Sequence, residues 1–422
     1  MTKKVITTSL SPNITVRQVR TCLGFLFNPF KWGAWRKGAC GDTLERSLEE
    51  YLHVPHVIRF DSGRAALYFA LKAFGIGKGD EVLVQAYTCV SVPNAVLWAS
   101  AHPKYVDIQD DFNVDPKQIE KHITEKTKAI IVQHTFGKPA DMDAIVEIVK
   151  RYNLIIIEDV AHALGAEYKG KKVGSFGDAA IFSFGRDKVI SGVSGGAVSC
   201  KDDSISKRVR EYQESVPSFG RMATAKHLVY PPLFYLIKKT YSVVSFGKAL
   251  AYIAKKLRIT PLVLTDSEKC AVMPKDIFKK MPNALACLIL EQFSSVDTIN
   301  NDRRKKAQDY SEALKEVEGI ILPREDVDEK HIFLRYTVLV KNGNELRKVA
   351  KENNIILGDW YSVAVAPPDT AFEKVFYTQG MCPNAEKRAA ESVNLPSHAD
   401  VSSSDMSKVI KIVKDYCSKN PL

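Results

Sequence analysis

Two hydrophobic periods alternate along the first half of the chain. Short and almost wholly apolar runs predict buried strands, and the stretches between them carry apolar residues at helical spacing. The predicted strands are 54–60, 80–86, 104–108, 128–134, 154–159, 178–184 and 195–200, and the predicted helices are 42–52, 64–76, 91–101, 115–123 and 141–153. Such an alternation is typical of a parallel sheet covered on both faces, so we predict an α/β domain.

The alternation of predicted strands and helices ends after residue 200. Residues 201–280 lack the alternation, 281–318 have a long helical pattern, and a strand at 331–340 is followed by three further helical stretches. We therefore predict three parts. They are an N-terminal arm with the first helix at 1–50, a large domain at 51–280 with an insertion at about 201–280, and a smaller α+β domain at 281–422.

The composition is ordinary for a globular protein of 422 residues, with 45% hydrophobic residues. The eight cysteines are scattered, without a C-x-x-C motif or a Cys/His cluster at metal-ligand spacing, so we expect reduced thiols and no metal site. The N-terminus has no apolar signal region, and no uncharged apolar run is long enough to span a bilayer. These features favour a cytoplasmic protein.

The formal charge of +11 is unevenly placed, because most of the excess lies between residues 201 and 280. Within it, residues 226–258 mix aromatic side chains with Lys and Arg and contain no acid. Nucleic-acid binding is disfavoured, because no known nucleic-acid motif accompanies the charge. Two interpretations stay open: an insertion that packs on the protein or across a dimer interface, and a helical hairpin that contacts an anionic membrane.

Polar residues that could bind a ligand or take part in catalysis stand where predicted strands end. Ser62–Arg64 opens a helix after the first strand, Asp159 ends another strand, and Ser183 and Lys188 follow a third. Ligands of α/β sheets bind at this edge, with phosphates at helix N-termini. An anion site, a carboxylate and an amine are what pyridoxal phosphate requires. The plain alternatives are a turn, a helix cap at Asp159 and a solvated Lys188.

A longer motif strengthens the cofactor interpretation. IEDVAHALGAEYKGKKVGSFGDAAIFSFGRDK resembles the signature of the DegT/DnrJ/EryC1/StrS sugar aminotransferases, and SGRAALYFAL, HTFGKPADMDAI and NLPSHADVSS resemble other motifs of that family, in the same order. The resemblance implies a fold type I pyridoxal phosphate enzyme. Its large domain would have a mainly parallel seven-stranded sheet flanked by helices, its C-terminal domain would be smaller and α+β, and it would act as a homodimer.

The resemblance also implies roles for single residues. Lys188 would bind the cofactor aldehyde covalently, Asp159 would face the pyridine nitrogen, and His162 would lie beside the ring hydroxyl. Gly63, Arg64 and Ser183 would contact the phosphate, the guanidinium of Arg64 adding a charge-assisted contact. Family members with a dehydratase activity carry His in place of the lysine, so Lys188 favours transamination.

Four departures from the family pattern stand out. Arg64 stands where the family has a small hydroxyl residue, although its backbone N–H can still bind phosphate. Cys89 aligns with the aromatic residue that stacks on the cofactor, so Tyr87 or another ring would have to take its place. Phe278 and Lys280 stand where the family has an Asn and an Arg that clasp the neighbouring subunit's phosphate. The substrate loop is replaced by DWYSVAVAPP, which leaves the sugar undefined.

The resulting prediction is a pyridoxal phosphate dependent aminotransferase. It would move an amino group from an amino acid, by family resemblance glutamate, to a nucleotide-linked keto-deoxysugar used for surface polysaccharide. Two alternatives stay open at this point: another fold type I enzyme such as an amino-acid lyase, and a regulatory protein that binds ligand without turnover.

Overall fold

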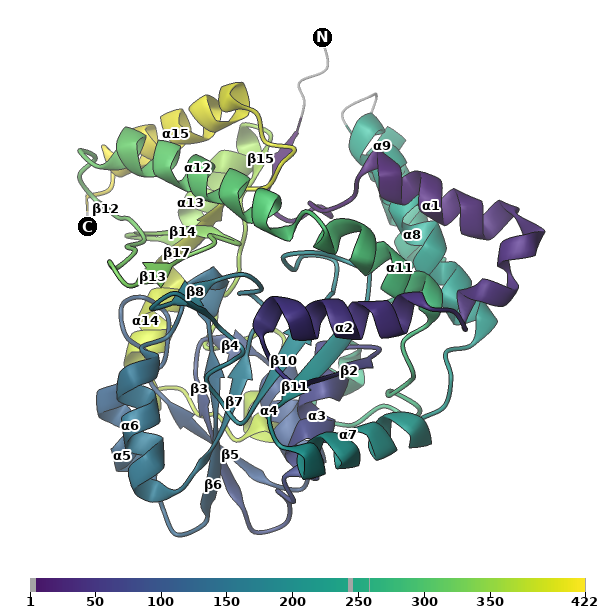
Figure 1. Cartoon of the computed structure of the whole chain (residues 1–422). Coiled ribbons are helices and arrows are strands. Elements are labelled where there is room, and N and C mark those ends of the chain that lie inside the picture. The colour runs from purple at the N-terminus through teal and green to yellow at the C-terminus, as the bar shows by residue number, and fades with distance from the viewer. Residues whose placement is uncertain (1–4, 242–245, 258, 422) are drawn as a thin grey trace.

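A seven-stranded sheet forms the centre of the computed structural model, which describes residues 5–241, 246–257 and 259–421 (Figure 1). Its strands are, in spatial order, β2 (His56–Phe60), β11 (Gly196–Cys200), β10 (Ala179–Ser183), β7 (Ile155–Asp159), β6 (Thr127–Gln133), β3 (Glu81–Gln85) and β5 (His102–Val106). β11 runs antiparallel to β2 and β10, and the other neighbouring pairs are parallel. The predicted α/β class and mainly parallel sheet are confirmed.

Alternate residues of each strand enter different cores, because side chains of a strand point to opposite faces. In β10, Ala179 and Ile181 join the core with the first group of helices, and Ala180 and Phe182 join the opposite one. The first group is α3 (Gly63–Ala73), α4 (Ser91–Trp98) and α7 (Asp203–Ser215). The opposite face is covered by α2 (Cys40–Leu52), α5 (Pro116–His122), α6 (Met142–Tyr152) and α11 (Asn283–Phe293).

A separate core lies in the C-terminal part. Here a small sheet orders β12 (Ile320–Ile321), β14 (Tyr336–Val340) and β17 (Ser392–Leu395), and the helices around it are α12 (Val296–Leu314), α13 (Gly343–Glu352), α14 (Pro383–Glu391) and α15 (Ser403–Cys417). The N-terminal strand β1 (Ile6–Thr7) pairs with β15 (Ile355–Ile356), so the two ends of the chain share this core. The predicted domain boundaries stay a prediction.

Shorter strands join these parts. β4 (Thr88–Cys89) pairs with β16 (Val365–Ala366), and β8 (Glu167–Tyr168) lies between β9 (Lys171–Lys172) and β13 (Glu329–Lys330). Both sheets connect the first half of the chain to residues beyond 328. The C-terminal part is thereby held against the edge of the central sheet where β6, β7 and β10 end.

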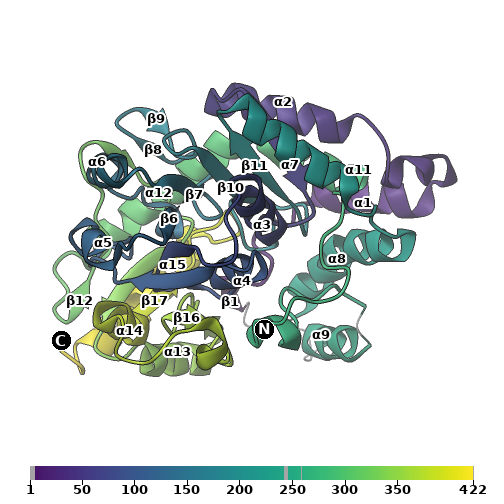
Figure 2. The ribbon, with the colours of Figure 1, turned by 90° about the horizontal axis from the view of Figure 1, so that it is seen from below.

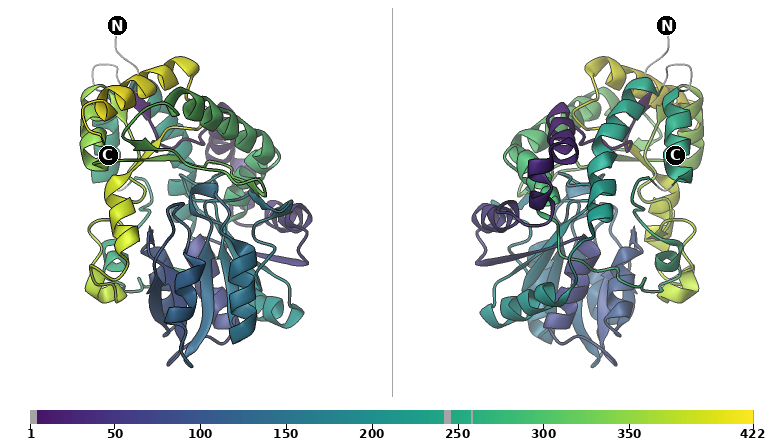
Figure 3. Two further views of the ribbon diagram at one scale, coloured as in Figure 1. Left: turned by 90° about the vertical axis from the view of Figure 1, so that its left-hand side faces the viewer. Right: turned by 90° about the vertical axis from the view of Figure 1, so that its right-hand side faces the viewer.

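The basic insertion forms helices. α8 (Arg221–Thr240) packs against α1 (Val16–Phe27), and α9 (Phe246–Lys256) packs against α8. The three helices lie side by side on one flank of the molecule (Figure 2; Figure 3, right). Among the described residues, none of the helices has the length and hydrophobicity that crossing a bilayer requires.

A disulfide joins Cys40 to Cys287, so the expectation that all cysteines are reduced is wrong for this pair. Cys40 begins α2 and Cys287 lies in α11, and the packing of these two helices brings the Cα atoms to 5.1 Å. The two cysteines are 247 residues apart along the chain, and that spacing contains no sign of their proximity. The remaining six cysteines are free thiols.

Candidate active site

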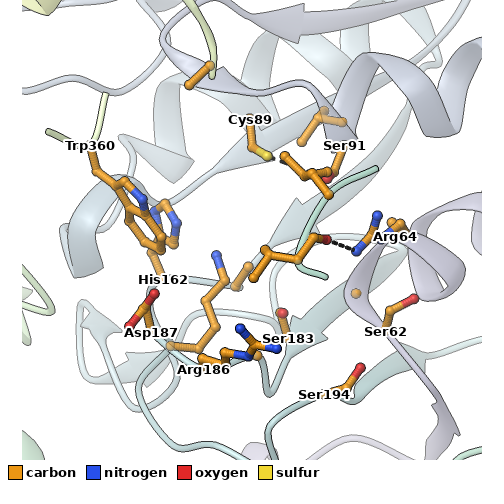
Figure 4. A pocket seen from close by; sticks show the side chains of 18 of the residues that line it. Ser62, Arg64, Cys89, Ser91, His162, Ser183, Arg186, Asp187, Ser194 and Trp360 are labelled. Atoms are coloured by element: carbon orange, nitrogen blue, oxygen red, sulfur yellow. Dashed lines mark hydrogen bonds between the residues drawn. The ribbon is translucent and has the colours of Figure 1, made fainter. Parts of the chain in front are cut away.

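One cavity of about 400 Å³ lies where β6, β7 and β10 end, a volume in the range of small-molecule sites (Figure 4). Gln133, Asp159 and Ser183, the last residues of those strands, contribute to its wall. The cavity brings together every site residue predicted from the sequence. These residues are Gly63, Arg64, Cys89, Asp159, His162, Ser183 and Lys188.

The N-terminus of α3 faces the cavity through a turn in which Gly63 has no side chain. Ser62 caps the helix, its hydroxyl accepting a hydrogen bond from the Ala65 N–H at 3.3 Å. A Cβ on Gly63 would lie 2.9 Å from the Cβ of Ser183, and a Cβ on Gly196 would lie 2.3 Å from the carbonyl carbon of Ser62. Free N–H groups and the helix dipole make this turn suited to a phosphate.

Arg64 lies in the same turn, but its guanidinium has other partners. It forms an ion pair with Glu268 and donates a hydrogen bond to the carbonyl oxygen of Val263 at 2.6 Å. Glu268 belongs to the short helix α10 (Asp266–Lys269). The guanidinium of Arg64 is thus turned toward these partners, and contact of Arg64 with an anion stays a prediction.

Lys188 lies on the loop between β10 and β11 and is half-buried in the cavity wall. Burial lowers the pKa of the Lys188 amine, against the opposing effect of the nearby Asp159 carboxylate. Burial raises the pKa of Asp159, while the Ala161 N–H, 3.0 Å from its Oδ1, and the charge of Lys188 act the other way. A lowered amine pKa increases the neutral fraction of Lys188 near pH 7, and the neutral amine is the nucleophile and base.

His162 lies against an aromatic wall. Its ring stacks on Trp360 with centroids 5.2 Å apart, and its Nε2 is 3.3 Å from the Tyr361 hydroxyl (Figure 4). Burial, with the charges of Lys188 and Arg335, lowers the pKa of His162 well below its ordinary value, so the ring is neutral. The Lys188 Nζ lies 4.9 Å from the centroid of the Trp360 ring.

Tyr87, one of the rings that could replace the family's stacking residue, lies outside the cavity wall. Tyr87 is fully buried, stacks on Phe112 with centroids 4.9 Å apart, and donates its hydroxyl to Ser392 at 3.0 Å. Among the described residues, the Trp and Tyr side chains in the cavity wall are Trp360 and Tyr361. They come from the loop DWYSVAVAPP, whose sequence shows aromatic residues but not their position.

A second layer of polar side chains holds the lysine loop, and the sequence analysis did not find it. Backbone carbonyls of 188–191 accept hydrogen bonds from Asn13 (2.5 Å), Arg303 (3.0 Å) and Gln18 (2.8 Å). These donors come from the N-terminal arm, from α12 and from α1, respectively. They share no motif with Lys188, and only the packing of both chain ends around the loop reveals their function.

The sequence analysis also did not find Asp187 and Arg335. Asp187 lines the cavity, and burial raises the pKa of its carboxyl while the charge of Arg335 lowers it. Arg335 is buried behind the wall, with its Cζ 4.8 Å from the centroid of the Trp360 ring, and donates to the carbonyl of Thr8 at 2.7 Å. The pair adds charge of both signs close to Lys188.

The residues at the positions of the family's phosphate clasp lie elsewhere. Phe278 stacks on Tyr68 with centroids 4.7 Å apart, and the backbone N–H of Lys280 donates to the carbonyl of Pro217 at 3.0 Å. Neither residue is part of the cavity wall.

Comparison with known proteins identifies relatives of this arrangement. The pattern of the DegT/DnrJ/EryC1/StrS aminotransferase family matches residues 28–228 and 254–414. The pleiotropic regulatory protein of Geobacillus stearothermophilus is 30% identical over 377 residues, 88% of each chain. The dTDP-3-amino-3,6-dideoxy-alpha-D-galactopyranose transaminase of Aneurinibacillus thermoaerophilus is 29% identical over 377 residues, 89% of each chain.

A solved structure agrees along almost the whole chain. DesV of S. venezuelae, in complex with a ketimine intermediate, superimposes with a TM-score of 0.73 at 25% identity, covering 95% of this chain and 94% of that chain. The family match omits residues 229–253, which hold the second half of α8 and most of α9, and it begins after α1.

Proposed function

The chain belongs to the DegT/DnrJ/EryC1/StrS aminotransferase family, and from this premise we propose that it transfers an amino group from an amino acid to a nucleotide-linked keto-deoxysugar with pyridoxal phosphate. The observation that supports the proposal most is the grouping of Lys188, Asp159 and the α3 N-terminus in one cavity. These are an amine, a carboxylate and an anion site, and they come from three separate elements.

The residues of the cavity fit the cofactor. The turn at Gly63 would hold its phosphate. This position requires glycine, because a side chain there would collide with Ser183. Asp159 would hold a proton on the ring nitrogen, and Trp360 would limit the space beside the ring. When bound, pyridoxal phosphate supplies a reactive aldehyde and a ring that accepts electrons.

The chain's own residues supply the remaining chemistry. The Lys188 Nζ, with its lowered pKa, would carry the proton between the substrate carbon that bears the nitrogen and the cofactor carbon that was the aldehyde. His162 stays neutral and, through Tyr361 and Trp360, is held rigidly against the cavity. Asp159 is buried, which strengthens the attraction between its carboxylate and a protonated ring nitrogen.

The finer assignments are also proposals. The amino donor is glutamate, and the acceptor carries a nucleotide, as the name of the Aneurinibacillus relative indicates for that enzyme. The product serves surface polysaccharide synthesis, and the enzyme is a cytoplasmic homodimer. Neither Cys40 nor Cys287 lines the cavity, so reduction of their disulfide in the cytoplasm leaves the site residues in place.

The two alternatives have less support. A ligand-binding regulator has no need of a lysine in the cavity wall whose pKa is lowered. A lyase would use the same amine and carboxylate, but it would release a fragment of an amino acid instead of aminating a ketone. Product analysis therefore separates the lyase from the transaminase.

Two measurements test the proposal. Borohydride treatment of the holoenzyme should add the mass of reduced cofactor to the peptide that contains Lys188, and the variant Lys188→Ala should lose this addition. The control Lys171→Ala changes an exposed lysine of β9 and should keep it. Incubation with glutamate and a panel of nucleotide keto-sugars should then yield an amino sugar by mass. Cofactor attachment that persists in Lys188→Ala, or a holoenzyme that aminates none of the panel, would refute the assignment.

A further inference from the structure

A group of packed helices that carry exposed basic and apolar side chains forms one flank of the molecule. It is built from α1, the short 3-10 helices η1 (Pro29–Lys31) and η2 (Gly33–Trp35), α8 and α9, and we call it the basic flank (Figure 3, right). α1 and residues 229–253 fall outside the family match. Of the flank, α1, the second half of α8 and most of α9 therefore lie outside the family match, and η1 and η2 lie inside it.

The flank is strongly cationic for a simple reason. Residues 1–41 and 215–265, the two segments that build it, contain no Asp or Glu at all. Two of its basic residues contact carboxylates of neighbouring elements: Arg17 lies 3.7 Å from Glu291, and Lys238 pairs with Asp400. The exposed basic residues of the flank are Arg17, Arg20, Lys31, Arg221, Lys226, Lys239, Lys248 and Lys256.

Large apolar side chains are exposed among these charges. On α1, Val16, Leu23 and Phe27 recur at helical spacing on the outer face, and Phe27 is 78% exposed. Beyond the helix, Phe30 is 97% exposed and Trp32 51% exposed. The other exposed apolar residues of the flank are Met222, Leu236, Phe246, Tyr252, Ile253 and Leu257.

Three occupants could cover such a surface, and its chemistry favours one. A second copy docked through a two-fold axis would bring the acid-free segments of both chains together, so like charges would repel. Nucleic acid would pair with the lysines but leave the aliphatic and aromatic side chains without a partner. An anionic bilayer offers phosphates to the basic residues and an apolar interior to the others.

We propose that the basic flank docks the enzyme onto anionic phospholipid membranes. Phe27, Phe30 and Trp32 enter the headgroup boundary, and the lysines and arginines around them bind lipid phosphates. The two ends of the α8–α9 hairpin reach the cavity wall, through His227 and through the segment 261–264. Docking therefore holds the cavity beside the membrane surface. The inference goes beyond the proposed amino transfer and does not depend on it.

Flotation of the full-length holoenzyme tests the proposal. Vesicles of equimolar phosphatidylglycerol and phosphatidylcholine should carry the protein upward in a density gradient, and vesicles of phosphatidylcholine alone should not. The variant Phe27→Ser/Phe30→Ser/Trp32→Ser should lower the partition coefficient at least about tenfold, because it removes three apolar anchors. The control Val327→Ser changes a residue that is fully exposed (104%) outside the flank, and it should float like the wild type.

Each other outcome overturns the proposal. These outcomes are failure to float with anionic vesicles, equal flotation with neutral vesicles, and unchanged flotation of the triple variant. A wild type that stays with the soluble fraction but binds a DNA duplex would assign the flank to nucleic acid. If the wild type does not float and the triple variant has a lower oligomeric state by ultracentrifugation, the basic flank would be assigned to contact with a second copy. Circular dichroism of the variants shows whether they are folded.

Discussion

Replacement of Gly196 by alanine tests the geometry of the anion site. Gly196 is the first residue of β11 and pairs with both Phe60 and Ser183 in the sheet, so its backbone cannot move freely. An added Cβ would lie 2.3 Å from the carbonyl carbon of Ser62 and 2.5 Å from the backbone nitrogen of Gly63. The glycine is required by this close approach of two backbone segments.

The size of the effect follows from the contact distance. Ordinary van der Waals contact begins at 3.4 Å, so the turn must retreat from 2.3 Å by about 1 Å. Overpacking of this kind costs roughly 1–3 kcal/mol of stability. A displacement of about 1 Å in a positioning element weakens function by about a hundredfold. Gly196→Ala should therefore lower the free energy of unfolding by about 1–3 kcal/mol and the affinity for pyridoxal phosphate by about a hundredfold.

The assay is a titration of the apoprotein with pyridoxal phosphate, followed by absorbance, together with denaturant unfolding. Gly185→Ala is the matched control, because its added Cβ would lie 3.7 Å from the nearest atoms of Ser183 and Lys188, an ordinary contact in the same cavity. It should behave like the wild type. Normal affinity and stability in Gly196→Ala, or equal losses in both variants, would refute the reasoning.

Three further predictions concern charge and cross-linking. Burial raises the pKa of the Asp61 carboxyl from 3.8 to about 7. The folded state therefore loses stability as the pH rises from about 4 to about 7, and the full penalty remains above pH 7. Asp61→Asn should thus raise the melting temperature more at about pH 8 than at about pH 5, and the opposite order would contradict the assignment. Asp159→Asn removes a charge that raises the pKa of Lys188. The pH midpoint for chemical labelling of the Lys188 amine in the apoprotein, followed by mass spectrometry, should therefore fall. A midpoint that stays or rises would argue against coupling between Asp159 and Lys188. Reduction of the Cys40–Cys287 disulfide, which closes a loop of 247 residues, should lower the unfolding free energy by about 2–4 kcal/mol, and a Cys40→Ser/Cys287→Ser variant should show no further loss with reductant.

Local patterns in the sequence predicted the elements and the chemistry at strand ends. Asp159, Ser183 and Lys188 follow apolar runs, and parallel strands bring their carboxyl ends to one edge, so their meeting in one cavity could be anticipated. Arg64 shows where this reasoning stops. Its place in the turn was predictable, but the direction of its guanidinium depended on Glu268, which lies about 200 residues away in the chain.

Residues without a motif could not be anticipated at all. Trp360 forms a wall of the cavity because the C-terminal part packs over the strand ends, and Asn13 reaches the carbonyl of Lys188 because the N-terminal arm crosses the same region. Each contact joins positions more than 170 residues apart. No periodicity in the sequence records such pairs, since they depend on how complete elements stack.

The sequence by itself determined the α/β class, the amine and carboxylate at the strand ends, and the two acid-free segments. Each of these is a property of residue type and local spacing, which set backbone conformation, burial and charge. The tertiary structure alone decided which aromatic ring faces Lys188, that Cys40 meets Cys287, and that the acid-free segments form one flank. Those outcomes are contacts between distant parts of the chain, and they exist only after the cores on both faces of the sheet have packed.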